Sequence, residues 1–280
     1  MQTREKKNAL LERLAESFTI NNKVFVLVNV MIFISIPLLV PLKYRFGVDT
    51  GYTQIILFVL MFLFSLWQSK NIYFRLPQNS FDTKNKKLSF LIYYIYVPLL
   101  APIATILIAG LVGRVFVKNS NPQGLTSISS NEIYISLVTD ILAGAEEVWR
   151  YSSILVIYLL LNYGVGKLNK GKNIQIALLM ISFIVSSFLF GWMHTFAYSD
   201  GWINLDITIM IGLMGLCFAS IMFITKRIWS VILTHIVFDV YATFNSYDRT
   251  IVNSILIVTC LSVSIILLLT KRKGKTEIEI

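Results

Sequence analysis

The chain has 280 residues, of which 56% are hydrophobic and 14% are charged, and its mean hydropathy is +0.70. Soluble domains carry about 25% charged residues, so the composition excludes a disordered chain and argues against a soluble globular enzyme. Cys217 and Cys260 are too few for a disulfide framework or a thiolate metal site. The net charge of +10 comes from basic residues in short loops between apolar stretches. This pattern is typical of a polytopic membrane protein, and no nucleic-acid partner is expected.

Eight apolar stretches are long enough to cross a bilayer, which takes roughly 17–25 residues in a helix. Span four is longer than needed and more polar than the rest, so we expect it to be tilted, kinked or partly outside the membrane. The sequence therefore predicts an all-α transmembrane bundle of about eight helices. The predicted spans are 24–42, 51–67, 88–112, 133–161, 174–196, 203–225, 228–244 and 251–270.

The distribution of basic residues tests this topology. If the N-terminus is cytoplasmic, 19 basic residues fall in the inner segments and 5 in the outer loops. Inner loops of membrane proteins carry an excess of Lys and Arg. The bias therefore supports eight crossings with both termini in the cytoplasm.

Three regions follow from this division of the chain. Residues 1–23 place Leu10, Leu14 and Phe18 at helical spacing among basic residues. We expect an amphipathic helix on the inner leaflet, with a disordered tail as the alternative. Residues 24–270 form the membrane domain, and residues 271–280 form a cytoplasmic tail.

Ionisable residues inside the spans are the candidates for function, because a charge within a membrane costs several kcal/mol unless it is paired or lines a cavity. Both histidines of the chain fall inside apolar segments. The full set is Asp140, Glu146, Glu147, Arg150, His194, Asp206, His235 and Asp239.

The spacing of Glu146 and Glu147 from Arg150 suggests different roles for the two glutamates. Arg150 lies four residues after Glu146 and three after Glu147, so it can reach either carboxylate. The glutamates are about 100° apart around a helix and cannot serve the same role. We expect Glu147 to pair with Arg150 and Glu146 to point into a cavity, with a purely structural Glu–Arg pair as the alternative.

Two further pairs have a spacing of four residues. His235 and Asp239 share one helix face, where the carboxylate can orient the imidazole. Phe190 and His194 share a face of another helix. Asp140 is ambiguous, since it can be solvated.

A carboxylate and two imidazoles on three helices fit the activation of water for hydrolysis. A partly dehydrated glutamate can act as a general base near neutral pH. Imidazoles can bind a metal or the water, and an Asp or His can stabilise the developing oxyanion.

Three motifs together, Glu146-Glu147-x-x-Arg150, Phe190-x-x-x-His194 and His235-x-x-x-Asp239, resemble the CPBP family of CAAX proteases and bacteriocin-processing proteins, also called the Abi family. They occur in the family's order on separate predicted helices. The resemblance implies an intramembrane endopeptidase that acts on a membrane-associated peptide or a lipidated protein.

The resemblance also implies roles for these residues. Glu146 would be the general base, and His194 would share the attacking water. His235 and Asp239 would stabilise the oxyanion or complete a metal site, with the Glu147–Arg150 pair and Phe190 in support. Glu146, His194 and His235 could ligate zinc, and a metal-independent glutamate mechanism is equally open, because no His-Glu-x-x-His motif is present.

The last motif position separates branches of the family. The prenyl endopeptidase branch usually has Asn there, and Asp239 matches the broader bacterial pattern. The high Ile, Asn and Lys content also favours a bacterial plasma-membrane protein. We therefore expect a peptide precursor, such as a bacteriocin or pheromone leader, over a prenylated substrate.

Two other functions compete with a peptidase. A non-catalytic regulator or bacteriocin-immunity protein would bind a membrane-protein partner and need no cleavage. A proton-coupled transporter would use the same ionisable residues as a relay, but the sequence has no repeated halves.

Overall fold

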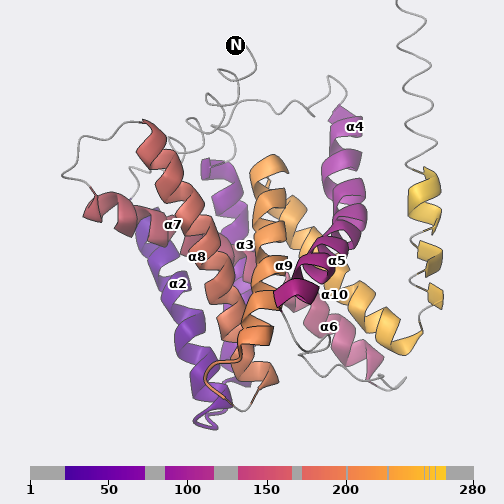
Figure 1. The fold of residues 1–280 in the computed structure, drawn as a ribbon, viewed down its shortest axis with the longest axis horizontal. Coiled ribbons are helices and arrows are strands. Elements are labelled where there is room, and N and C mark those ends of the chain that lie inside the picture. Colours follow the sequence, from indigo (N-terminus) through magenta and orange to yellow (C-terminus); the bar gives the residue numbers. More distant parts are fainter. Residues whose placement is uncertain are drawn as a thin grey trace, which may run out of the picture.

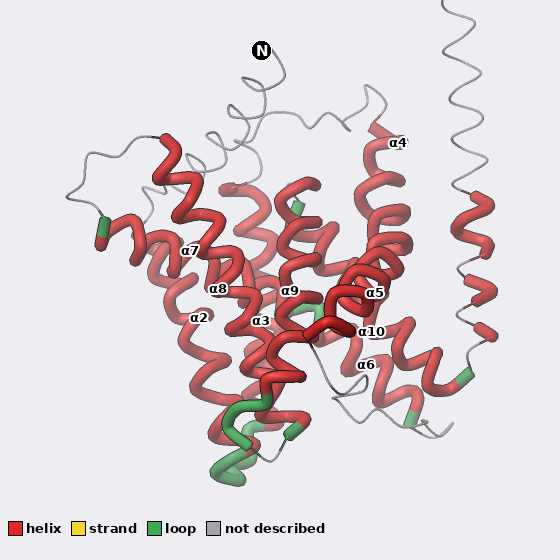
Figure 2. The backbone as a smooth tube through the Cα atoms, viewed as in Figure 1, coloured by secondary structure: helices red, strands yellow, loops and turns green. Residues whose placement is uncertain are grey.

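The computed structural model describes residues 23–72, 86–116, 132–165, 172–199, 201–225, 227–248, 250–251, 253–255 and 257–262. These residues form helices and short connections, with no strand in the described ranges (Figures 1 and 2). Within these ranges, six helices are long and apolar enough to cross a membrane. The predicted all-α multi-pass bundle is confirmed. The predictions for the N-terminal segment 1–23 and the tail 271–280 fall almost wholly outside the described residues.

Six of the predicted spans match helices of the required length and apolarity. Span eight is described only in part, so that crossing stays a prediction. The helices are α2 (Lys23–Tyr44), α3 (Gly51–Ile72), α4 (Lys86–Leu91) with η2 (Ile92–Tyr96) and α5 (Val97–Phe116), α6 (Ile133–Ala143), α7 (Glu146–Gly164), α8 (Lys172–Tyr198), α9 (Leu205–Thr225) and α10 (Ile228–Tyr247).

Span three contains one widened turn. The N–H of Val97 donates to the carbonyl of Ile92, which is a π-helical bond. Pro98 follows directly and has no N–H to donate. A missing donor explains why regular α-helical bonding gives way at this point.

Span four, predicted as one segment over residues 133–161 with a kink among the expected departures, is interrupted and forms two helices. It breaks at Gly144 and Ala145 into α6 and α7. A Cβ atom on Gly144 would lie 2.6 Å from a side-chain carbon of Ile236, so the glycine permits close packing of the break against α10. Because of this break, Glu146 and Glu147 lie in the first turn of α7, where the helix dipole favours negative charge.

α7 forms the centre of the bundle. Its side chains from Glu147 to Val156 are buried without interruption. Asn29 of α2 accepts hydrogen bonds from Ser152 of α7 at 2.8 Å and from Gln68 of α3 at 3.0 Å. The indole of Trp149 also donates to the carbonyl of Phe33. Polar bonds thus tie α7 to two helices in a setting where hydrophobic forces between helices are weak.

Candidate active site

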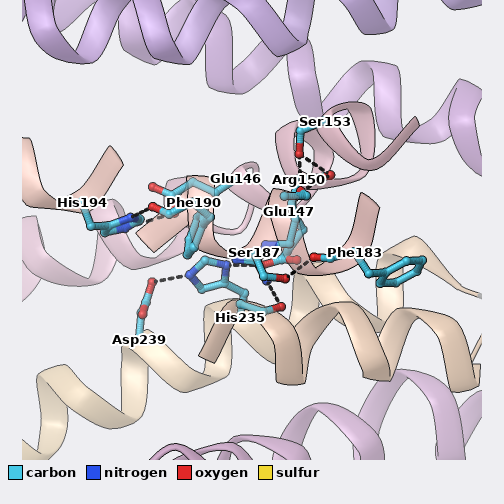
Figure 3. A network of polar contacts seen from close by, with 12 residues as sticks. Glu146, Glu147, Arg150, Ser153, Phe183, Ser187, Phe190, His194, His235 and Asp239 are labelled. Carbon is cyan, nitrogen blue, oxygen red and sulfur yellow. Dashed lines mark hydrogen bonds and ion pairs between the residues drawn. The ribbon is translucent and has the colours of Figure 1, made fainter. Parts of the chain in front are cut away.

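Glu147 is buried at the centre of the site, where it contacts both Arg150 and His235 (Figure 3). Its side chain is 3% exposed, and Oε1 lies 3.1 Å from Nη2 of Arg150 and 2.6 Å from Nδ1 of His235. The pairing with Arg150 agrees with the interpretation of the motif spacing. The contact with His235 joins α7 to α10 across 88 residues of sequence, and spacing within one helix could not reveal it.

Arg150 connects three helices of the bundle. Its side chain is 1% exposed, and Nη1 donates to the carbonyl of Gly215 in α9 at 3.1 Å. The guanidinium lies 4.0 Å from the ring centroid of Phe190 and 5.4 Å from that of Phe218. The carboxylate, the carbonyl and two aromatic faces offset part of the cost of burying this cation. It therefore fixes α7 against the helices that carry the aromatic rings.

His235 lies between two carboxylates. Nδ1 faces Glu147, and Nε2 lies 3.4 Å from Oδ2 of Asp239 on the same helix. The ring of Phe218 packs 5.0 Å away, centroid to centroid. An imidazolium with an N–H on each nitrogen satisfies both contacts, so the ring orientation is fixed from both sides.

Glu146 and His194 form a second, more open pair. Oε2 of Glu146 lies 3.7 Å from Nε2 of His194, and the side chains are 24% and 22% exposed. This separation is too long for a direct hydrogen bond and is compatible with one bridging water. Nδ1 of His194 lies 2.9 Å from the carbonyl of Phe190. A proton on Nδ1 satisfies that carbonyl, which leaves the lone pair of Nε2 directed at Glu146.

The side chain of Phe190 separates the two pairs. Its ring centroid lies 4.4 Å from that of His194 and 6.2 Å from that of His235 (Figure 3). Glu146 therefore faces His194, while His235 contacts Glu147 instead. The seven motif residues still gather at one place, from α7, α8 and α10.

The zinc set predicted from the sequence does not fit this arrangement. Both ring nitrogens of His235 face carboxylates other than Glu146. Over the residues that the structure describes, no three His, Cys, Asp or Glu side chains are grouped so that they could hold a metal ion.

Three other residues lie at the site, and of these the sequence offered only Asp140 as a candidate. Asp140 of α6 bonds Thr243 and interacts electrostatically with Asp239 and His235, which places it beside the site. Gly215 belongs to a small-residue pattern that indicates close helix packing, but its bond to Arg150 had no signal. Phe218 had none either, because one more aromatic residue in an apolar helix is ordinary.

A comparison with known families matches residues 87–241 to the type II CAAX prenyl endopeptidase Rce1-like family. The matched region contains all seven residues of the three motifs. No curated protein and no solved structure gives a match.

Proposed function

The chain belongs to the type II CAAX prenyl endopeptidase Rce1-like family, and from this premise we propose that it is an intramembrane endopeptidase in which Glu146 activates water. The substrate is a membrane-associated peptide or a lipidated protein. The observation that carries the proposal is the 3.7 Å gap between Glu146 and His194, both partly exposed.

The Glu146–His194 pair and the Glu147–His235 pair have different roles in the reaction. A water hydrogen-bonded to both Glu146 and His194 attacks the scissile carbonyl, and Glu146 takes its proton. Glu146 then returns the proton to the leaving amine as the C–N bond breaks. Nε2–H of His235 has only a long contact with Asp239, so this donor can be taken over by an oxyanion without rotation of the ring. Glu147 and Arg150 hold this imidazole in place.

Cleavage by the purified protein in liposomes tests the proposal. The probes are two fluorescence-quenched peptides, a farnesylated CAAX peptide and an unlipidated leader-type peptide. Glu146→Gln and His194→Asn should each lower the cleavage rate at least about 100-fold, and a chelator should have no effect. Full cleavage by Glu146→Gln, or loss with a chelator that zinc restores, would contradict the mechanism.

Cells provide the complementary measurement. Peptides that accumulate with wild-type protein but not with Glu146→Ala identify natural products of cleavage. A cellular effect that persists in Glu146→Ala would instead indicate a non-catalytic regulator that binds a membrane partner.

A further inference from the structure

The C-terminal end of α8 is held by a residue from a distant part of the chain. Arg45 follows α2, and its guanidinium donates to the carbonyls of Ser199 and Gly201. The same guanidinium lies 5.3 Å from the ring centroid of Phe196. The family match begins at residue 87, so Arg45 lies outside the matched region.

Arg45 has the chemistry of a helix cap. The last carbonyls of a helix have no partners within the helix, and its C-terminal end carries partial negative charge. Arg45 places its positive charge at this end and donates to Ser199, the residue directly after α8, while its second acceptor, Gly201, lies in the turn that follows.

Aromatic contacts also join the turn between α2 and α3 to the turn between α8 and α9. Trp202 packs against Phe46 and Phe196, with ring centroids 6.3 Å and 5.4 Å apart. The indole of Trp192 donates to the carbonyl of Trp202 at 3.0 Å. The α2–α3 and α8–α9 turns therefore form one packed unit around Arg45.

This unit adjoins the imidazole of His194. Tyr198 is the last residue of α8, directly before Ser199, and its ring stacks on His194 with centroids 6.1 Å apart and planes 14° from parallel. Phe190 contacts His194 one turn earlier. A ring on each side and the Phe190 carbonyl thus define the direction of Nε2.

We propose that Arg45 is a positioning residue for His194. By capping α8 it holds Tyr198 against the imidazole, and this contact keeps Nε2 directed at Glu146. The inference rests on the proposed function in one respect, which is that His194 orients the attacking water.

The closing experiment compares Arg45→Gln with Lys43→Gln. Lys43 is a matched control because it lies at the same end of α2, while its recorded contacts are with Gln54 and Tyr44. The chain has two histidines, so ¹⁵N-histidine NMR in nanodiscs gives two sets of signals, which His194→Asn and His235→Asn assign.

Arg45→Gln should convert the signal of His194 from a single Nδ1–H tautomer to a mixture and leave His235 unchanged. It should lower kcat about tenfold with KM within about twofold, and Lys43→Gln should change neither. Arg45→Lys keeps the charge without the guanidinium and should give intermediate signals. If Arg45→Gln does not fold, Arg45→Lys replaces it in the comparison.

An unchanged His194 signal in a folded Arg45 variant, or an equal change in Lys43→Gln, would overturn the inference. The NMR measurement does not need activity. If no variant and no wild-type protein cleaves any peptide, the proposed function fails while the signals of His194 still decide the role of Arg45.

Discussion

Two adjacent glutamates at the start of α7 have opposite surroundings. Glu147 is 3% exposed and contacts Arg150 and His235, whereas Glu146 is 24% exposed and faces only His194 among the recorded ion pairs of the described residues. A buried, fully engaged carboxylate is poorly suited to take a proton from water. The structural and chemical roles therefore divide between neighbours in the chain.

Replacing each glutamate should separate these roles. Glu147→Ala leaves Arg150 as an unpaired buried cation, which should cost about 3–5 kcal/mol of stability. Glu146→Ala removes a partly exposed carboxylate and should leave the thermal unfolding temperature in detergent nearly unchanged. Equal losses of stability in the two variants would contradict the division of roles.

At the scale of elements, α8 and α9 approach at a glycine. A Cβ atom on Gly191 would lie 2.2 Å from the carbonyl oxygen of Thr208 and 2.7 Å from the backbone nitrogen of Gly212. Both are backbone atoms of α9, so neither can move without shifting the helix. Close packing at this point sets the position of the α8 turn that carries His194.

Gly191→Ala should therefore push α8 away from α9. We expect a loss of about 1–3 kcal/mol in stability together with a loss of cleavage, measured by thermal unfolding and by the peptide assay. Gly164→Ala is the control, because a Cβ atom there meets nothing within 4 Å. The control should keep both properties, and if Gly191→Ala also keeps them, the helices are not in close contact there.

Across the whole molecule, the α2–α3 and α8–α9 turns lie at one end of the bundle, since Arg45 binds the carbonyls of Ser199 and Gly201 (Figure 1). The charge pattern independently places both turns on the outer side. The structure and the charge pattern therefore agree that both turns lie on one side of the membrane, and the charge pattern alone assigns that side as the outer one.

Cysteine labelling checks this orientation. Cysteines at Asp49 and Gly201, both exposed, should react with a membrane-impermeant reagent in intact cells. A cysteine at exposed Gly164, which is expected on the inner side, should react only after permeabilisation. Cys217 and Cys260 are replaced by Ser beforehand. Labelling of position 164 in intact cells would reverse the topology.

The sequence alone was sufficient for membrane class, helical fold and the residues worth testing. Apolar length and loop charge are properties of the chain itself, and so is spacing within one helix, which paired Arg150 with Glu147 and His235 with Asp239. The family match over residues 87–241 agrees with the resemblance drawn from the same motifs.

Which residues meet across helices depends on how the helices are packed. Helical spacing fixes the direction of a side chain around its own axis, but the partner depends on how helices cross and how closely they pack. For this reason the contact of His235 with Glu147, the break at Gly144 and the reach of Arg45 to the end of α8 became visible only when the helices were assembled.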